Sequence, residues 1–167
     1  MSPTKAIKMI VAWSFSRLDT YLGCPQKAKF KFLDKLPEPP APALERGSAI
    51  HKLCEGYLIG TIKRLPKELK LFAEEFKALR KIAKHLQVEA ELAFDKDWKP
   101  VGWFAYDCWC RIKVDLMYDD PYETDTRAVT DWKTGKRPDR ADWLEPKLRQ
   151  VTLYAAAVEA HDKRPVA

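Results

Sequence analysis

Several features that define whole classes of protein are missing from this sequence of 167 residues. No run approaches the roughly 20 apolar residues of a membrane-spanning helix, and the N-terminus lacks a long apolar signal segment. The four cysteines include no Cys-x-x-Cys pair, so neither a zinc ribbon nor a secreted disulfide framework is indicated. A Gly-x-Ser-x-Gly elbow is also absent, which argues against a serine hydrolase. We therefore expect a soluble, reduced, cytoplasmic protein with no membrane partner.

The composition is that of a folded protein. Hydrophobic residues make up 46% of the chain and six are Trp, which excludes general disorder. A formal net charge of +6 makes the chain mildly basic and compatible with a polyanionic partner. The length predicts a single domain over residues 1–167, with a helical N-terminal part at about 14–85 and a sheet-plus-helix core at about 86–160.

A short strand near residue 130 carries the strongest chemical pattern. Ala128, Val129 and Thr130 favour a buried strand, so Asp131 and Lys133 should share one face while Trp132 points into the apolar layer. A carboxylate is a hard ligand for magnesium or manganese, and a nearby ammonium group can activate a water or neutralise a phosphate oxygen. The alternative is a plain ion pair at a strand end.

Periodicity predicts the remaining elements. Helices are expected from Ser14 or Ser16 to Leu22, over Gln26–Leu33, Leu44–Ile59 and Lys67–His85, and from about Glu145 to Ala160. Further strands are expected over Gln87–Phe94 and Trp103–Met117. Three strands would then carry Glu89 or Glu91, Asp115, and Asp131 with Lys133.

Two helices carry polar residues at a spacing of four. Gly47 and His51 share a helix face, and the glycine allows a close approach one turn before the histidine. His51 is either a packed or surface histidine or a metal ligand. Gln150 and Tyr154 also share a face, and ordinary helix packing explains them by default.

Taken together, the motifs resemble the RecB-type branch of the PD-(D/E)XK nuclease superfamily over residues 13–158. The resemblance implies an α/β (α+β) fold, with a central mixed sheet flanked by helices and a restriction-endonuclease-like core. The motifs that carry it are Ser14-x-Ser16-x-Leu18-x-x-Tyr21-x-x-Cys24-Pro25, Gly47-x-x-x-His51, Asp115, Asp131-x-Lys133-Thr134-Gly135 and Gln150-x-x-x-Tyr154.

The resemblance implies a metal-dependent DNA nuclease, either an exonuclease or an endonuclease. Such enzymes use magnesium or manganese in recombination, repair, phage replication and CRISPR adaptation, and a phage-encoded member would work in the host cytoplasm. One alternative is a non-catalytic DNA-binding or assembly subunit that keeps the fold. A third reading is a structural or interaction domain in which Asp131 and Lys133 form a simple ion pair.

The resemblance also implies roles for individual residues. His51, Asp115 and Asp131 would bind the metal, with the backbone carbonyl of Trp132 as an extra ligand. Lys133 would position or deprotonate the attacking water and stabilise charge on the phosphate. Two carboxylates and a neutral imidazole match one divalent cation in charge.

Other residues would serve the DNA. The resemblance implies that Gln150 and Tyr154 order the catalytic site and touch the DNA strand. The basic pair Lys136 and Arg137 is expected to contact DNA, as is the Lys27–Lys31 stretch, although a solvated cationic face is the commoner explanation of such a stretch by itself.

The chain departs from its relatives at two points. Some relatives hold an iron–sulfur cluster with a cysteine like Cys24 plus three cysteines after the last helix, but no cysteine follows Cys110. We therefore expect no such cluster, and expect Cys24 to be a packed thiol. Relatives also continue with another strand, so either this is a minimal member or a missing piece, a protein partner or self-association completes the sheet.

Overall fold

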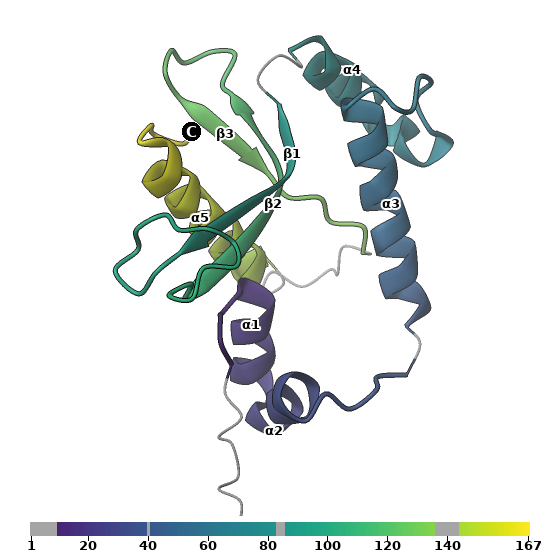
Figure 1. Ribbon diagram of the computed structural model, residues 1–167. Coiled ribbons are helices and arrows are strands. Elements are labelled where there is room, and N and C mark those ends of the chain that lie inside the picture. The colour runs from purple at the N-terminus through teal and green to yellow at the C-terminus, as the bar shows by residue number, and fades with distance from the viewer. Residues whose placement is uncertain (1–9, 40, 83–85, 136–143) are drawn as a thin grey trace, which may run out of the picture. The chain divides into compact units, whose positions relative to one another are not determined.

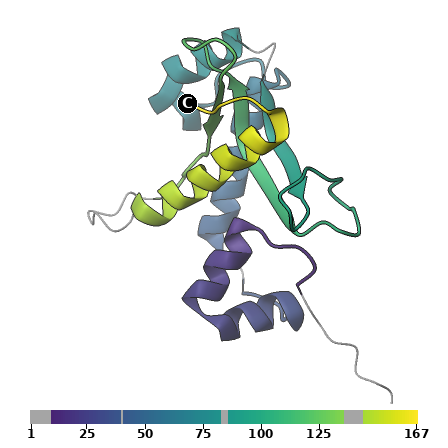
Figure 2. The same cartoon turned by 90° about the vertical axis from the view of Figure 1, so that its left-hand side faces the viewer.

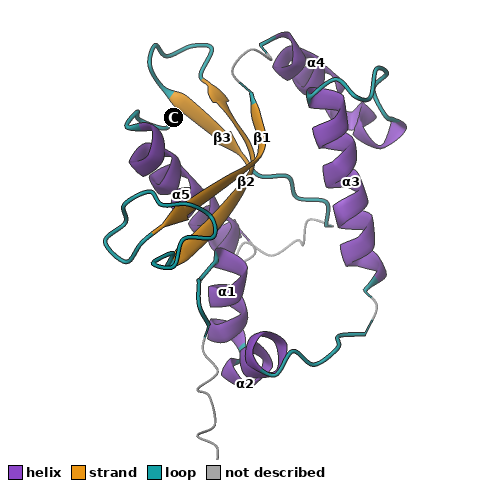
Figure 3. Cartoon of the chain, viewed as in Figure 1, coloured by secondary structure: helices purple, strands orange, loops and turns teal. Residues whose placement is uncertain are grey.

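The computed structural model describes residues 10–39, 41–82, 86–135 and 144–167 (Figure 1). The chain forms two compact units: a small unit of Met1–Pro40 and Ala93–Ile112, and a large unit of Ala41–Leu92 and Lys113–Ala167. Figure 3 colours the elements by type. In chain order they are α1 (Phe15–Gly23), α2 (Pro25–Ala28), the π-helix η1 (Lys29–Leu33), α3 (Pro42–Leu58), the 3-10 helix η2 (Lys67–Phe72), α4 (Ala73–Lys81), β1 (Gln87–Phe94), β2 (Cys110–Asp119), β3 (Arg127–Thr130) and α5 (Leu144–Asp162).

The strands form a sheet in the order β1-β2-β3. β2 and β3 pair antiparallel, with Leu116 opposite Thr130 and Asp119 opposite Arg127. After α5 the chain returns to β3, where Val166 forms a parallel bridge with Arg127. The expected α/β fold, with helices and a restriction-endonuclease-like sheet core, is confirmed.

The large unit has an apolar core between α3, α4 and the strands. Proline at the start of α3 fixes the helical φ of the first turn, and Gly60, with a φ of 87°, follows the end of this helix in a conformation that suits glycine. The buried side chains of this core are Cys54, Tyr57, Leu58, Leu69, Phe76 and Leu116. Burial of these side chains fixes α3 and α4 against the strand that carries Asp115.

Helix α5 contacts β3 and crosses in front of the strands in the view of Figure 2. Tyr154, Ala157 and Val158 are buried on this helix, whereas Leu148 is exposed. Gln150 lies one turn before Tyr154, so the same packing that buries Tyr154 fixes where Gln150 stands.

The small unit is built from the first helices and the loop between β1 and β2. Ser14 caps α1 as expected, because its hydroxyl accepts a hydrogen bond from the Arg17 backbone N–H at 3.3 Å. Ala12, Ala93 and Cys108 form a small buried cluster. No helix among the described residues is long and apolar enough to cross a membrane.

Three expected elements are different in the structure. The helix expected over Lys67–His85 is split at Phe72 into η2 and α4, because the backbone of Phe72 (φ −115°, ψ 33°) leaves the helical region. Leu71, in η2, is 84% exposed. The end of the expected helix, at residues 83–85, lies outside the described part.

The strand expected over Trp103–Met117 begins only at Cys110. Turns replace its first half: the Ala105 N–H donates to the Gly102 carbonyl at 2.9 Å, and the Cys108 N–H donates to the Ala105 carbonyl at 3.1 Å. These turns satisfy the backbone hydrogen-bonding groups within the loop, so the segment forms no strand although its aromatic residues favour one.

The expectation for the second helix and for Cys24 also needs correction. The Gln26–Leu33 segment starts at Pro25 as α2 and continues as the π-helix η1. Pro25 therefore opens a helix, because its fixed φ suits the first helical position. Cys24 is exposed, not packed, and its sulfur accepts from the Lys27 N–H at 3.4 Å as a helix cap.

Candidate active site

The segment that follows β3 brings Asp131 and Lys133 to one side. β3 ends at Thr130, so these residues lie just beyond the strand on which they were expected. Trp132 points the other way and stacks on Phe76, with ring centroids 5.0 Å apart. The side chain of Asp131 is only 5% exposed, and its Oδ2 atom contacts the Lys133 ammonium group. Burial of Trp132 in the core thus determines which way its two neighbours face.

Asp115 joins this segment to β2. Its Oδ2 atom accepts a hydrogen bond of 2.7 Å from the Trp132 N–H, so the carboxylate and the segment are held in register. On the same residue, the Trp132 carbonyl is 3.1 Å from Nε2 of His51. The other ring nitrogen of His51, Nδ1, lies 3.5 Å from Oδ1 of Asp115. One imidazole therefore touches both a carboxylate and a backbone carbonyl.

Gly47 explains how α3 comes close enough for His51 to make these contacts. A Cβ atom at Gly47 would lie 3.1 Å from Oγ1 of Thr134, which is tighter than almost all real contacts of this kind. The expected close approach one helical turn before His51 therefore exists, and Thr134 is the residue that approaches.

Helix α5 completes the hydrogen bonding. The Lys133 ammonium group donates to Oε1 of Gln150 at 2.8 Å. The amide of the same glutamine donates to Oδ1 of Asp131 at 3.2 Å and to the Tyr154 hydroxyl at 2.6 Å. Gln150 and Tyr154 are therefore part of a polar network that holds Asp131 and Lys133 in place.

Glu89 is a further member of the site, for which the sequence alone predicts no role. His51, Glu89 and Asp115 each place one possible ligand atom within 4.8 Å of the others. Asp131 is not a member of this group of three; Lys133 and Gln150 hold it instead. Glu89 has a φ of 55°, unusual for a residue inside a strand. Strand alternation named Glu89 or Glu91 without distinguishing them, and this backbone turn is not visible in the sequence.

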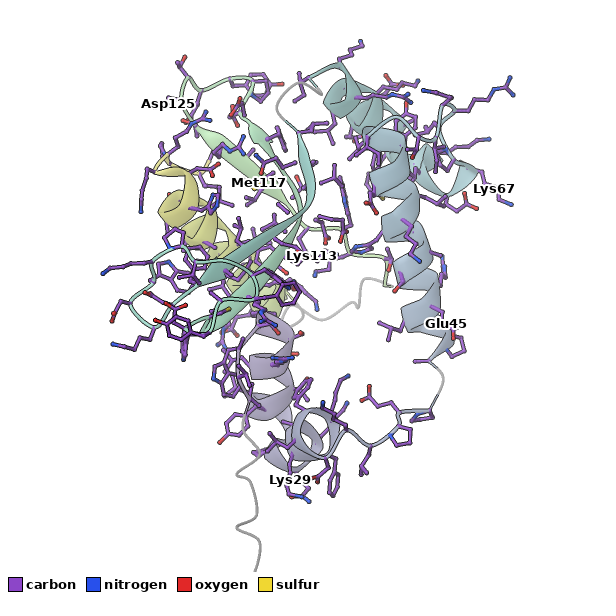
Figure 4. The ribbon with its side chains drawn as sticks, viewed as in Figure 1. Lys29, Glu45, Lys67, Lys113, Met117 and Asp125 are labelled. Carbon is purple, nitrogen blue, oxygen red and sulfur yellow. The ribbon has the colours of Figure 1, made fainter. Side chains whose placement is uncertain are left out.

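A cleft of about 490 Å³ opens over this group. Gly47 and His51 line it from α3, and Glu89, Asp115 and Lys113 line it from the strands. The Lys113 ammonium group pairs with Glu89 at 2.7 Å, and Figure 4 shows Lys113 on β2. The site is therefore open to a ligand.

The amino-acid sequence matches the family model of the PD-(D/E)XK nuclease superfamily over residues 12–167. The chain belongs to this superfamily. No curated protein and no solved structure matches it. Members of the superfamily are generally hydrolytic nucleases, and these nucleases use divalent metals. The group of His51, Glu89 and Asp115 could bind such a metal.

The electrostatics of this PD-(D/E)XK site favour a cation. Burial raises the pKa of Asp115, and the nearby carboxylates of Asp131 and Glu89 raise it further, although the Trp132 N–H and His51 oppose the rise. Oδ2 of Asp131 is buried and accepts no hydrogen bond; its contact with Lys133 is an ion pair. A divalent cation would offset this concentration of negative charge, and carboxylate, carbonyl and imidazole ligands suit magnesium or manganese.

Tyr154 stays a neutral phenol over the physiological pH range. Burial raises the pKa of Tyr154 to about 12; the hydrogen bond from Gln150 opposes this rise, and the charge of Asp131 adds to it. Tyr154 can therefore act as a hydrogen-bonding anchor for Gln150 but not as a base at neutral pH.

The basic residues expected to contact DNA are in two places. Lys136 and Arg137 lie outside the described residues. In the small unit, Lys29 pairs with Asp34 at 2.6 Å and Lys31 pairs with Glu38 at 2.7 Å. These two lysines are therefore partly neutralised.

Proposed function

We propose that this chain is a DNA nuclease that depends on magnesium or manganese. One observation carries the proposal: Asp131 and Lys133 flank Trp132, whose backbone N–H and carbonyl contact Asp115 and His51 of the His51, Glu89 and Asp115 group. This arrangement combines ligands for a cation with an ammonium group for the phosphate. The order of the motifs favours the RecB-type branch of the superfamily.

The residues present fit a divalent metal ion. His51, Asp115 and the carbonyl of Trp132 would hold it, with Asp131 and Glu89 as further carboxylates. When bound, the metal would lower the pKa of a coordinated water and offset charge on the phosphate. Asp115 would then act as a ligand in its charged form, although burial favours its protonated form in the metal-free protein.

Lys133 would handle the proton of the attacking water. Its ammonium group has only donors to offer, so it is not a metal ligand in that form. Attack of the water oxygen on phosphorus, in line with the leaving O3′ atom, would break the P–O3′ bond. The products would be a 5′-phosphate and a 3′-hydroxyl, and the proton from the water would end on the leaving oxygen.

Gln150 and Tyr154 would act mainly by positioning the charged residues of the site. Gln150 bonds to both Lys133 and Asp131, so it would hold the charged pair in place for the substrate. Tyr154 fixes Gln150 in turn. We propose that both also contact the DNA strand, together with Lys136 and Arg137.

The proposal is tested by digestion of plasmid and labelled oligonucleotides with and without manganese. Wild type should cut, and Lys133→Ala should lose about 10²- to 10⁴-fold in rate, the usual effect of losing an acid–base group. Lys77→Ala is the matched control, because Lys77 is an exposed lysine that pairs with exposed Glu74 in the same unit. This variant should cut at the wild-type rate.

Two outcomes would count against the proposal. Cleavage by Lys133→Ala at the wild-type rate would make Lys133 a bystander and assign any cleavage to another site or a contaminant. Failure of wild type to cut any DNA form with either metal would favour the non-catalytic DNA-binding subunit instead.

A further inference from the structure

Lys113 is a charged residue of the metal-site cleft that has no role in the reaction proposed above. It lies on β2 two residues before Asp115, so strand alternation places both side chains on the same face. Its ammonium group is 2.7 Å from Oε2 of Glu89, and Figure 4 labels its place on the strand. Both residues line the cleft together with His51 and Asp115. The chain thus places a cation of its own against one of the three possible metal ligands.

The two partners of this ion pair differ in how freely they can move. Glu89 has a φ of 55°, a left-handed conformation that persists in a residue other than glycine only where the surrounding structure requires it. The side chain of Glu89 is 22% exposed, whereas that of Lys113 is 50% exposed. Glu89 is therefore fixed at the cleft wall. Lys113 reaches it with a long, flexible stem and can withdraw without disturbing the core.

The Lys113 ion pair and metal binding make conflicting demands on Glu89. The carboxylate oxygen that accepts from an ammonium group has less capacity to act as a metal ligand. The ligand atoms of His51, Glu89 and Asp115 lie within 4.8 Å of one another, so a cation among them would also be close to the ammonium group. Like charges at such a distance repel, most strongly where water is partly excluded. The metal should therefore bind better once Lys113 has left Glu89.

We propose that Lys113 holds Glu89 in the metal-free protein and exchanges it for a phosphate oxygen of the substrate when the metal binds. The ammonium group contacts a possible metal ligand, so a phosphate bound at the metal is within its reach. An anionic oxygen then replaces the carboxylate, and the lysine keeps a charged partner. Metal and substrate strengthen each other's binding through this exchange, by the same factor in both directions. The inference rests on the proposed nuclease function and adds Lys113 to the residues that contact the substrate.

Manganese titration of the DNA-free protein by calorimetry tests the first half of the exchange. Lys113→Met keeps most of the side-chain length but removes the charge, and should bind manganese about tenfold more tightly than wild type. Lys52→Met is the matched control, because Lys52 is an exposed lysine of the same cleft that forms no ion pair with any described residue. It should change the affinity less than about twofold, as screening by solvent predicts. Lys113→Gln repeats the test should Lys113→Met fail to fold.

A double-mutant cycle shows whether Lys113 acts through Glu89. In a Glu89→Gln background, Lys113→Met should improve manganese affinity less than about twofold, because no carboxylate remains for the lysine to block. The same tenfold gain in both backgrounds would mean that Lys113 repels the metal by charge alone, and would overturn the exchange.

The second half of the exchange is tested with DNA that is not cut. Manganese affinity is measured with and without an excess of single-stranded or duplex oligonucleotide, in Lys133→Ala and in the double variant Lys133→Ala/Lys113→Met. The oligonucleotide should strengthen manganese binding about tenfold more in Lys133→Ala, because only this variant has a lysine for the phosphate to draw away from Glu89. Equal strengthening in both variants would overturn the role of Lys113 toward the substrate.

The outcomes separate this inference from the proposed function. Unchanged or weaker manganese binding by Lys113→Met overturns the exchange, while cleavage by wild type can still support the nuclease. If Lys113→Met binds manganese more tightly through Glu89 but wild type never cuts DNA, competition at Glu89 stands and the nuclease proposal fails.

Discussion

The two ends of the β2–β3 pair hold acidic residues in contrasting surroundings. Asp115 and Asp119 are four residues apart on β2. Asp119 is bound at its Oδ1 atom by Arg127 at 2.9 Å and by Arg164 at 2.7 Å. Asp115 is bound by a backbone N–H and lies near His51, and no lysine or arginine among the described residues forms an ion pair with it.

The pKa values of these carboxyl groups move in opposite directions. Burial raises the pKa of Asp115, and two nearby carboxylates add to the rise. Burial also acts to raise the pKa of Asp119, but hydrogen bonds from Arg164 and Arg127 outweigh it and lower the pKa. The charge of Asp119 is thus compensated by arginines, whereas the charge of Asp115 would be stabilised by a bound cation.

The arginine cluster, made of Asp119, Arg127, Asp162 and Arg164, connects separate elements of the large unit. Arg127 is 4% exposed and also pairs with Asp162 on α5 at 2.7 Å. Its backbone N–H and carbonyl bond to the C-terminal residues at 2.8 and 2.9 Å. This residue therefore joins β3, α5 and the end of the chain.

The largest stability effect should come from the arginine cluster. Arg127→Ala should lower the free energy of unfolding by about 3 kcal/mol, because it removes the buried guanidinium group that pairs with both Asp119 and Asp162. Urea titration measures the change. Arg149→Ala, which removes an exposed pair with Glu145, should cost less than about 1 kcal/mol. An equally small decrease in the free energy of unfolding for Arg127→Ala would show that the arginine cluster does not stabilise the fold.

Metal binding at the Asp115 end of the β2–β3 pair should stabilise the folded protein. Manganese at about 100 times its dissociation constant should raise the free energy of unfolding by about 2.7 kcal/mol, because it binds only the folded chain. Arg164→Ala should keep this increment, whereas His51→Ala should lose part of it. Thermal unfolding with and without manganese gives the comparison. Equal increments in both variants would remove His51 from the ligand set.

A smaller effect should appear in the pH dependence of the metal-free protein. The raised pKa of Asp115 contributes stability below its unfolded value, and this contribution disappears as the pH rises through the folded value. The lowered pKa of Asp119 contributes stability above the unfolded value of about 3.9, and this is lost as the pH falls through the folded value. Asp115→Asn and Asp119→Asn should flatten opposite sides of the stability profile. Urea titrations across pH 2–7 measure it, and flattening on the same side would refute the comparison.

Much of the fold follows from residue patterns. The bounds of β1 match the expected Gln87–Phe94, because regular alternation between turn residues defines a strand well. The expected Lys67–His85 helix failed at Phe72, where a local backbone break was not encoded by any glycine or proline. Periodicity recognises continuous elements, but it does not detect a break made by ordinary residues.

The site could be predicted in part for a similar reason. Asp131 and Lys133 share a side, and Trp132 faces the core, because neighbours along an extended chain alternate. The place of Glu89 depends on a left-handed backbone in mid-strand, which alternation cannot show. The Gln150 bridge depends on how α5 packs against β3, a tertiary contact that helical spacing alone does not give.

The central claim is that Asp115 belongs to a metal site while Asp119, on the same strand, does not. Calorimetric titration of manganese into Asp115→Asn and Asp119→Asn tests it with the same substitution at both positions. Asp115→Asn should lose at least tenfold in affinity, since it removes a charged ligand, and Asp119→Asn should bind as wild type does. Equal affinity in the two variants would contradict the account.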